Sequence, residues 1–202
     1  METTSVYVDY LCPFAWRGAE LAKLLGGKSS FRLRLFSLES GNHPDNAKDR
    51  HQLNWKLWEQ PLEGSRSLPQ FLAGLSARRQ GEEAFWNYSL ELFRLRHAEQ
   101  ADFSEQTLAL AAQRAGLDIA RWESDRRDQQ GLRAELKAEL EDAAQIAVFG
   151  TPTFQLPGGD AAYFRFTGDP RTMAESEREA LWKVYAAVLA SGAHIETVKR
   201  PR

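Results

Sequence analysis

The sequence has one cysteine, two methionines and no long apolar run among its 202 residues. Because Cys12 has no second cysteine to pair with, an internal disulfide is excluded. No stretch approaches the roughly 18 apolar residues that span a bilayer, and residues 1–9 lack the basic-then-apolar order of a secretion signal. Charges nearly balance, with 26 Lys and Arg against 28 Asp and Glu, which argues against binding to nucleic-acid phosphates. We therefore expect a cytoplasmic protein with no membrane partner and no nucleic-acid partner.

The sequence also lacks a metal-ligand pattern. It has four histidines with no ligand spacing, and one cysteine cannot complete a usual zinc set. Large apolar groups are abundant instead, with 11 Phe, 6 Trp and 5 Tyr in a composition that is 43% hydrophobic and 27% charged. Such a composition excludes a disordered chain and suffices for one large domain, or for a domain that carries an insertion.

The N-terminal part predicts a strand, a helix and a second strand. Residues 5–10 form a β-branched and aromatic run, and residues 31–38 alternate apolar and basic side chains before becoming apolar. Between them Pro13 suits the first position of a helix, which Gly26 and Gly27 end. This βαβ unit is expected to have parallel strands, and it places Cys12 at the N-terminal cap of the helix.

The central residues predict helices, and strands return near the end. We expect helices over 47–60, 67–80, 82–98, 104–116 and 128–146, after a loop over 40–46. Residues 153–156 and 163–167 flank a Pro-Gly-Gly-Asp turn, which predicts an antiparallel hairpin. A last helix over 171–191 is expected to bury Leu181, Trp182, Tyr185, Val188 and Leu189. The order is therefore βαβ, helical insertion, ββα.

This order and two short motifs resemble the DsbA-like thioredoxin-fold superfamily. Cys12-Pro13-Phe14-Ala15 stands where that family has Cys-Pro-x-Cys, and Gly150-Thr151-Pro152-Thr153-Phe154 looks like the loop whose proline is cis. The resemblance implies an α/β, thioredoxin-like fold of the DsbA type, with residues 1–45 and 146–202 as the thioredoxin-like domain and residues 46–145 as an all-helical insertion. It extends to the cytoplasmic branch of FrnE-type oxidoreductases, 2-hydroxychromene-2-carboxylate isomerases, kappa-class glutathione transferases and low-molecular-weight-thiol-dependent nitroreductases. Cys-Pro-aromatic-Ala-Trp is most similar to the last group.

The predicted position of Cys12 favours a catalytic nucleophile. A helix N-terminus has unpaired N–H groups and a partial positive charge, so it stabilises a thiolate over a thiol. Because Pro13 has no N–H, the donors expected nearest the sulfur are those of Phe14 and Ala15. Arg17 would add positive charge.

The residue at position 15 limits the chemistry. Ala15 stands where a dithiol oxidoreductase has its resolving cysteine. A mixed disulfide on Cys12 would need an outside thiol to release it, so the chain cannot hand over a disulfide of its own. The chemistry left open is monothiol exchange, transfer of a small thiol, or non-redox use of the pocket.

Further residues are expected to bind the substrate. In thioredoxin-like folds the residue before the cis proline lies beside the active sulfur, so the resemblance implies that Thr151 and Pro152 form the second wall of the site. Phe14 and Trp16 would give it an aromatic lip. Because ligands gather at the carboxyl ends of parallel strands, the loop after the second strand, with Glu39, Asn42 and His43, is expected on the same side as Cys12.

We interpret the chain as a thiol oxidoreductase that acts through Cys12 on a small-molecule or disulfide substrate. It would hold no covalent cofactor and would use a low-molecular-weight thiol of the glutathione, bacillithiol or mycothiol type. One alternative is an enzyme like the kappa transferases or hydroxychromene isomerases, which needs no covalent bond to cysteine. Another is a redox-inactive binding protein on the same scaffold. Apolar helical faces in the insertion suit a homodimer and suit a core equally.

Overall fold

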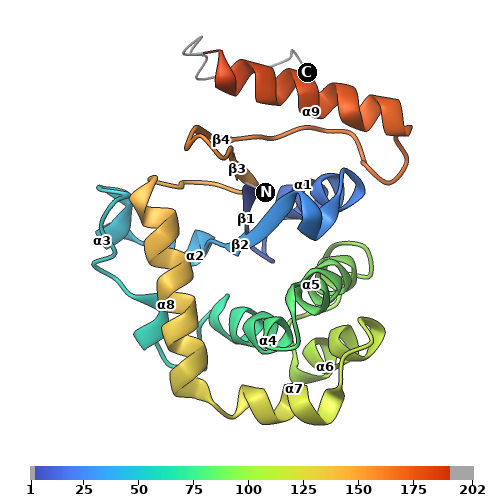
Figure 1. Ribbon diagram of the computed structural model, residues 1–202. Coiled ribbons are helices and arrows are strands. Elements are labelled where there is room, and N and C mark those ends of the chain that lie inside the picture. The colour runs from blue at the N-terminus through green and yellow to red at the C-terminus, as the bar shows by residue number, and fades with distance from the viewer. Residues whose placement is uncertain (1–2, 192–202) are drawn as a thin grey trace.

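A computed structural model describes residues 3–191, and its elements follow the expected order (Figure 1). Among these residues, no helix has the length and apolar character that crossing a membrane requires. In chain order the elements are β1 (Thr4–Val8), α1 (Pro13–Leu24), the 3-10 turn η1 (Gly27–Ser29), β2 (Phe31–Leu35), α2 (Leu38–Gly41), α3 (Pro44–Ala47), the 3-10 turn η2 (Leu57–Glu59), α4 (Leu68–Arg78), α5 (Glu82–His97), α6 (Glu105–Arg114), α7 (Ile119–Arg126), α8 (Gln129–Gln145), β3 (Thr153–Gln155), β4 (Ala161–Tyr163) and α9 (Glu175–Ala190).

The strands form one sheet in the order β2-β1-β3-β4. β1 pairs with β2 in parallel, with Val6 opposite Leu33, and with β3 in antiparallel, with Val6 opposite Phe154. β3 and β4 are the antiparallel hairpin. The predicted βαβ and ββ units are thus present, and they meet at β1, the strand that leads to Cys12.

Successive side chains of a strand point to opposite faces of the sheet, so the two faces contact different helices. Phe154 lies on the face that α1 and α9 cover, because its ring packs against Trp182 and Tyr185 of α9, with centroids 5.3 and 5.6 Å apart. Tyr7 points to the other face, where its hydroxyl donates to Asp142 of α8 at 2.6 Å. Figure 1 shows α9 on one side of the sheet and the helices α4–α8 on the other.

A buried ionic cluster joins the sheet to these helices. Glu139 of α8 is 5% exposed and accepts hydrogen bonds from the backbone N–H of Leu35 at 2.8 Å and from Arg34 at 3.0 Å. Its other oxygen accepts from Arg78 of α4 at 2.9 Å. One apolar core, which includes Val6 of β1 and Leu136 of α8, runs through both parts.

The predicted helix over residues 47–60 is wrong. In its place the chain has α3, which ends at Ala47, and the short turn η2. The reason is the buried side chain of Asn46, whose amide donates to the carbonyl of Trp55 at 2.7 Å and accepts from the N–H of Trp55 at 2.8 Å. A side chain that bonds the backbone in this way replaces the bonds of a helix.

Other boundaries also differ from the predictions. Residues 40–46 are not a plain loop, since α2 and α3 lie there, and α7 was not predicted. The second strand of the hairpin is β4, over Ala161–Tyr163, because the turn is shorter than expected. The last helix begins at Glu175 and leaves Val188 37% exposed. Within α9 only Tyr185 is buried, whereas Leu181, Trp182 and Leu189 are half-buried. The segment 192–202 of the expected thioredoxin-like domain lies outside the described residues.

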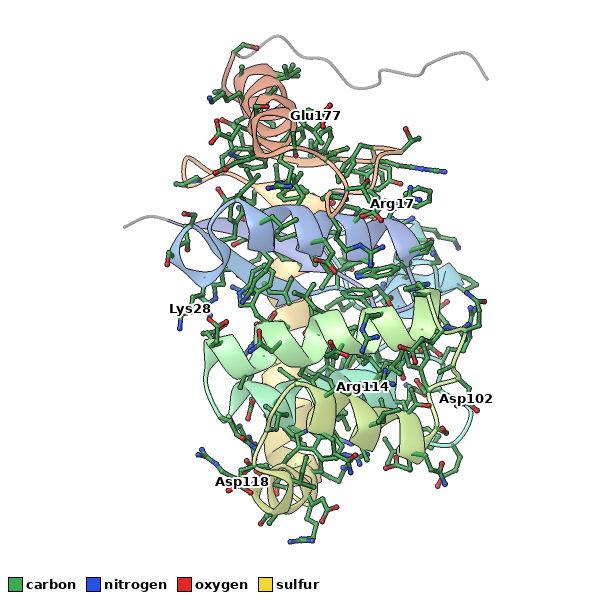
Figure 2. The ribbon with its side chains drawn as sticks, turned by 90° about the vertical axis from the view of Figure 1, so that its right-hand side faces the viewer. Arg17, Lys28, Asp102, Arg114, Asp118 and Glu177 are labelled. Carbon is green, nitrogen blue, oxygen red and sulfur yellow. The ribbon has the colours of Figure 1, made fainter. Side chains whose placement is uncertain are left out.

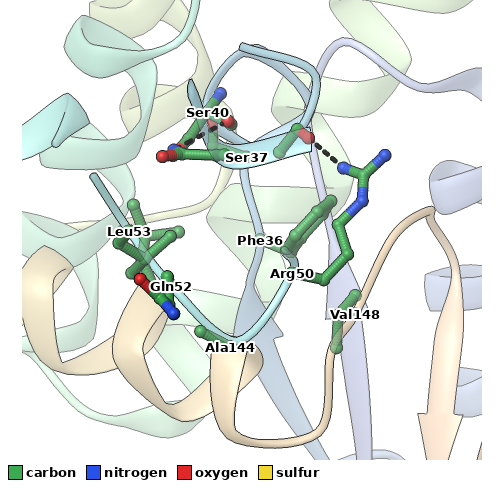
Figure 3. A pocket seen from close by; sticks show the side chains of 11 residues that line it. Phe36, Ser37, Ser40, Arg50, Gln52, Leu53, Ala144 and Val148 are labelled. Atoms are coloured by element: carbon green, nitrogen blue, oxygen red, sulfur yellow. Dashed lines mark hydrogen bonds between the residues drawn. The ribbon is translucent and has the colours of Figure 1, made fainter. Parts of the chain in front are cut away.

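The segment after β2 closes on α8 with little space left (Figure 3). Arg50 donates to the carbonyl of Gly41, and Phe36 packs beside Val148 in the same cluster. The cavity between them has a volume of about 10 Å³. Since a cavity of that size holds about one water molecule, it is no substrate site.

Candidate functional site

Cys12 lies in the turn between β1 and α1 and caps the helix. Its N–H donates to the carbonyl of Asp9 at 3.0 Å, and its own carbonyl accepts from Trp16 at 3.3 Å. Pro13 takes the first helical position, as predicted, and the thiol-bearing residue is 9% exposed. The backbone of Cys12 therefore holds its side chain at the N-terminus of α1, where little of the residue is exposed to solvent.

The segment between α8 and β3 supplies the second wall, and it contacts Cys12. The Cys12 thiol donates to the carbonyl of Thr151 at 3.3 Å, and the Thr151–Pro152 peptide bond is cis. The sulfur accepts no capping hydrogen bond from the first turn of α1, where the N–H groups of Phe14 and Ala15 were expected to be its nearest donors.

The loop that carries Thr151 is held close to α1. A Cβ atom on Gly18 would lie 2.5 Å from Cβ of Pro152, so only glycine allows this approach. Thr151 is 2% exposed, and its hydroxyl oxygen has no hydrogen-bond partner among residues 3–191. The residue that contacts the sulfur through its carbonyl thus also has a buried hydroxyl with no partner among these residues.

Sequence reasoning missed Asp9, which supports the loop that carries Cys12. Its two carboxyl oxygens accept from the N–H of Leu11 at 2.8 Å and of Leu38 at 2.6 Å, so it ties the cysteine loop to the segment after β2. Asp9 is fully buried, and burial raises its pKa to about 7 although both hydrogen bonds act in the opposite direction. The available signal was an acidic residue inside the β-branched and aromatic run over residues 5–10.

Aromatic side chains with arginines over their rings surround the cysteine. Trp16, 8% exposed, has the guanidinium of Arg171 over it at 4.2 Å. Phe14 has Arg165 at 3.7 Å and Arg17 at 5.4 Å from the centre of its ring. Figure 2 shows Arg17 on α1, near the segment that leads to α9. Phe14 and Trp16, the expected aromatic lip, thus each lie under a guanidinium group, and the sequence did not predict Arg165 and Arg171.

A hollow of about 170 Å³ opens beside this lip. His97, which the sequence did not single out, is part of its wall: its ring stacks on Trp16 with centroids 6.1 Å apart, and its Nε2 lies 2.9 Å from the carbonyl of Tyr10. Burial lowers the pKa of His97 below its usual 6.5, which favours a neutral ring at pH 7. The hollow is lined by Pro13, Trp16, Arg17, Glu20, His97, Asp169 and Arg171.

Asn42 and His43 have other roles. His43 caps α3, accepting from the N–H of Asp45, and its ring stacks on Trp55 at 4.6 Å. Asn42 ends α2. Glu39 accepts from the N–H of Ser67 at 2.9 Å. Within the described part of the chain, none of their contacts is with Cys12, so the structure does not bring this loop into the site.

The chain is similar to a known protein family over most of its length. The family of the DSBA-like thioredoxin domain matches residues 3–177. The chain belongs to this family. Its DSBA-like thioredoxin fold, with a mixed sheet and many helices, is therefore confirmed, as is the resemblance on which the expectation rested.

Solved structures of this fold are similar over nearly the whole chain. A probable DsbA oxidoreductase from Streptomyces coelicolor is 16% identical, with a TM-score of 0.59, over 98% of this chain and 93% of its own. A 2-hydroxychromene-2-carboxylate isomerase is 16% identical, with a TM-score of 0.58, over 94% and 98%. The cytosolic disulfide reductase DsbM from Pseudomonas aeruginosa, with GSH, is 14% identical, with a TM-score of 0.57, over 91% and 98%. No curated protein matches the sequence.

Proposed function

We propose that this DSBA-like protein is a thiol oxidoreductase that acts through Cys12 alone and is regenerated by an external low-molecular-weight thiol. The observation that carries the proposal is the position of the sulfur. Cys12 caps α1, and its sulfur lies 3.3 Å from the carbonyl of Thr151 beside the cis proline. Ala15 has no thiol to resolve a mixed disulfide, and its position is fully buried.

The reaction proposed is two thiol–disulfide exchanges. The Cys12 thiolate attacks one sulfur of a small disulfide, the new S–S bond forms to Cys12, and the other half leaves as a thiolate that takes up a proton. An external thiolate then attacks the mixed disulfide and releases Cys12. Atoms and electrons balance, because the external thiol is the reductant. Thr151 would orient the incoming sulfur through its carbonyl, its N–H or its unpartnered hydroxyl.

The external thiol would be of the glutathione, bacillithiol or mycothiol type. The DsbM structure with GSH supports the first of these, and the name of that cytosolic reductase agrees with a cytoplasmic role for this chain. The hollow beside Pro13 supports binding of a small molecule, since its charged and aromatic walls offer both hydrogen bonds and stacking.

A set of three proteins tests the proposal: wild type, Cys12→Ser and Ala15→Cys. Reduction of hydroxyethyl disulfide by glutathione is followed, and the mass of each protein is measured during turnover. We expect the wild type to turn over through a mixed disulfide and Cys12→Ser to do neither. Ala15→Cys should release the small thiol without added glutathione and form an internal disulfide. Full activity in Cys12→Ser would contradict the proposal.

One observation favours a second candidate, an isomerase or glutathione-transferase reaction without a covalent bond to cysteine. The thiol is only 9% exposed and already hydrogen-bonded, while the adjoining hollow is open to a ligand. Such an enzyme would need bound thiol but would keep its activity in Cys12→Ser. If the chain is a redox-inactive binding protein, neither the wild type nor Cys12→Ser nor Ala15→Cys should form a mixed disulfide.

A further inference from the structure

Most charged groups around the hollow are already paired. Arg171 donates from two nitrogens to the carboxylate of Asp169, at 3.0 and 2.7 Å. Glu20 accepts from the indole N–H of Trp16 at 3.0 Å. The salt bridge adds no net charge to the site, and Glu20, which has no salt bridge among the described residues, is a carboxyl whose pKa burial raises.

Arg17 and Arg165 are different, because neither forms a salt bridge within residues 3–191, although Arg17 lies near enough to Asp169 to help lower the pKa of that carboxyl. Arg17 makes one long hydrogen bond, 3.5 Å from its guanidinium to the carbonyl of Phe166. Arg165 is exposed, and its described contact is with the ring of Phe14. Stacking on a ring leaves the N–H edges of a guanidinium free to donate.

Phe14 brings this unpaired charge next to the sulfur. It lies two positions after Cys12 in the first turn of α1, and both guanidinium groups stack on its ring. Arg17 also lines the hollow that begins at Pro13, so a molecule bound there would meet one of the two cations directly. Two guanidinium groups without a salt bridge, both over the same ring, disfavour a cationic ligand and favour a carboxylate, which one guanidinium can bind with two parallel hydrogen bonds.

We propose that Arg17 and Arg165 form a carboxylate-binding site that selects anionic low-molecular-weight thiols and disulfides for reaction at Cys12. The inference rests on the proposed function and adds the charge of the substrate and the residues that recognise it. The exchange at sulfur is the one given above. The two arginines take no part in it and act by holding the carboxylate of the attached group.

Three small disulfides that differ in charge test the site: dithiodipropionate with two carboxylates, hydroxyethyl disulfide with none, and cystamine with two amines. The rate of mixed-disulfide formation on Cys12 is measured by intact-protein mass spectrometry and divided by the rate with a free model thiol. Wild type, Arg17→Gln and Arg165→Gln are compared. Arg32→Gln is the matched control, because Arg32 is exposed on β2 and has no ion pair in the described structure.

We expect the wild type to prefer the anionic disulfide over the neutral one and to disfavour cystamine. Each site variant should lower the ratio of anionic to neutral rates about tenfold, as for the loss of one charge-assisted hydrogen bond, whereas Arg32→Gln should keep it. High salt should lower the wild-type ratio. Equal ratios in the wild type and both site variants would overturn the inference and leave the proposed function standing. No mixed disulfide with any of the three would overturn both.

Discussion

Replacing Asp9 by Asn removes a buried ionisable group while keeping its shape. Burial raises the pKa of this carboxyl from 3.8 to about 7, so the folded chain keeps a proton that the unfolded chain loses near pH 4. The folded state therefore binds more protons between these two values, and stability falls as pH rises through this range. The difference between the two pKa values corresponds to about 4 kcal/mol, present below about pH 4 and lost above about pH 7.

The variant should lack this pH dependence. At low pH we expect Asp9→Asn to be less stable by about 1–3 kcal/mol, because one amide oxygen cannot accept from both Leu11 and Leu38 and one buried N–H loses its partner. As pH rises towards about 8, the wild type should lose its advantage, and the variant should become equally or more stable. Urea unfolding followed by tryptophan fluorescence measures the difference at each pH.

Asp160→Asn, in the exposed turn of the hairpin, is the control and should behave as the wild type at every pH. The reasoning would be refuted if the stability difference between wild type and Asp9→Asn were the same at low and at high pH. That result would mean that burial does not hold the proton on Asp9.

Two further substitutions test the packing that positions the site. Gly18→Ala should lower the free energy of unfolding in urea by about 1–2 kcal/mol, because overpacking against the ring of Pro152 outweighs the gain in helix propensity. It should also slow mixed-disulfide formation on Cys12. Gly158→Ala, where a Cβ atom would meet nothing within 4 Å, should have neither effect. Glu139→Gln should cost about 2–3 kcal/mol in the same assay, because Arg34 and Arg78 would lose their buried carboxylate and keep only Asp142 and Glu82, which are more exposed. A loss in the free energy of unfolding below about 1 kcal/mol would show that the Glu139 cluster contributes little to the packing of the helices against the sheet.

The sequence predicted well those strands and helices whose residues show a regular hydrophobic periodicity. Val6 and Leu33 belong to runs with strand periodicity, and Leu132 and Leu136 lie on one face of a helix, so these elements were predicted close to their observed bounds. Residues 47–60 failed because one buried side chain, Asn46, determines their path through contacts that no periodicity records.

The same distinction holds for the site. Cys12, Thr151 and Pro152 were recognised because they lie in short motifs, and the structure brings them together. Arg165 and Arg171 come from the irregular segment between β4 and α9, so nothing in their local sequence places them over the aromatic lip. Loops of this kind acquire their positions from tertiary packing.

The most direct test of the account is the mass of the intact wild-type chain after incubation with oxidised glutathione. We predict the gain of one glutathionyl group on Cys12, its removal by added glutathione, and no gain in Cys12→Ser. An unmodified wild-type chain under conditions in which a model thiol reacts fully would contradict the claim that Cys12 is a nucleophile in thiol exchange.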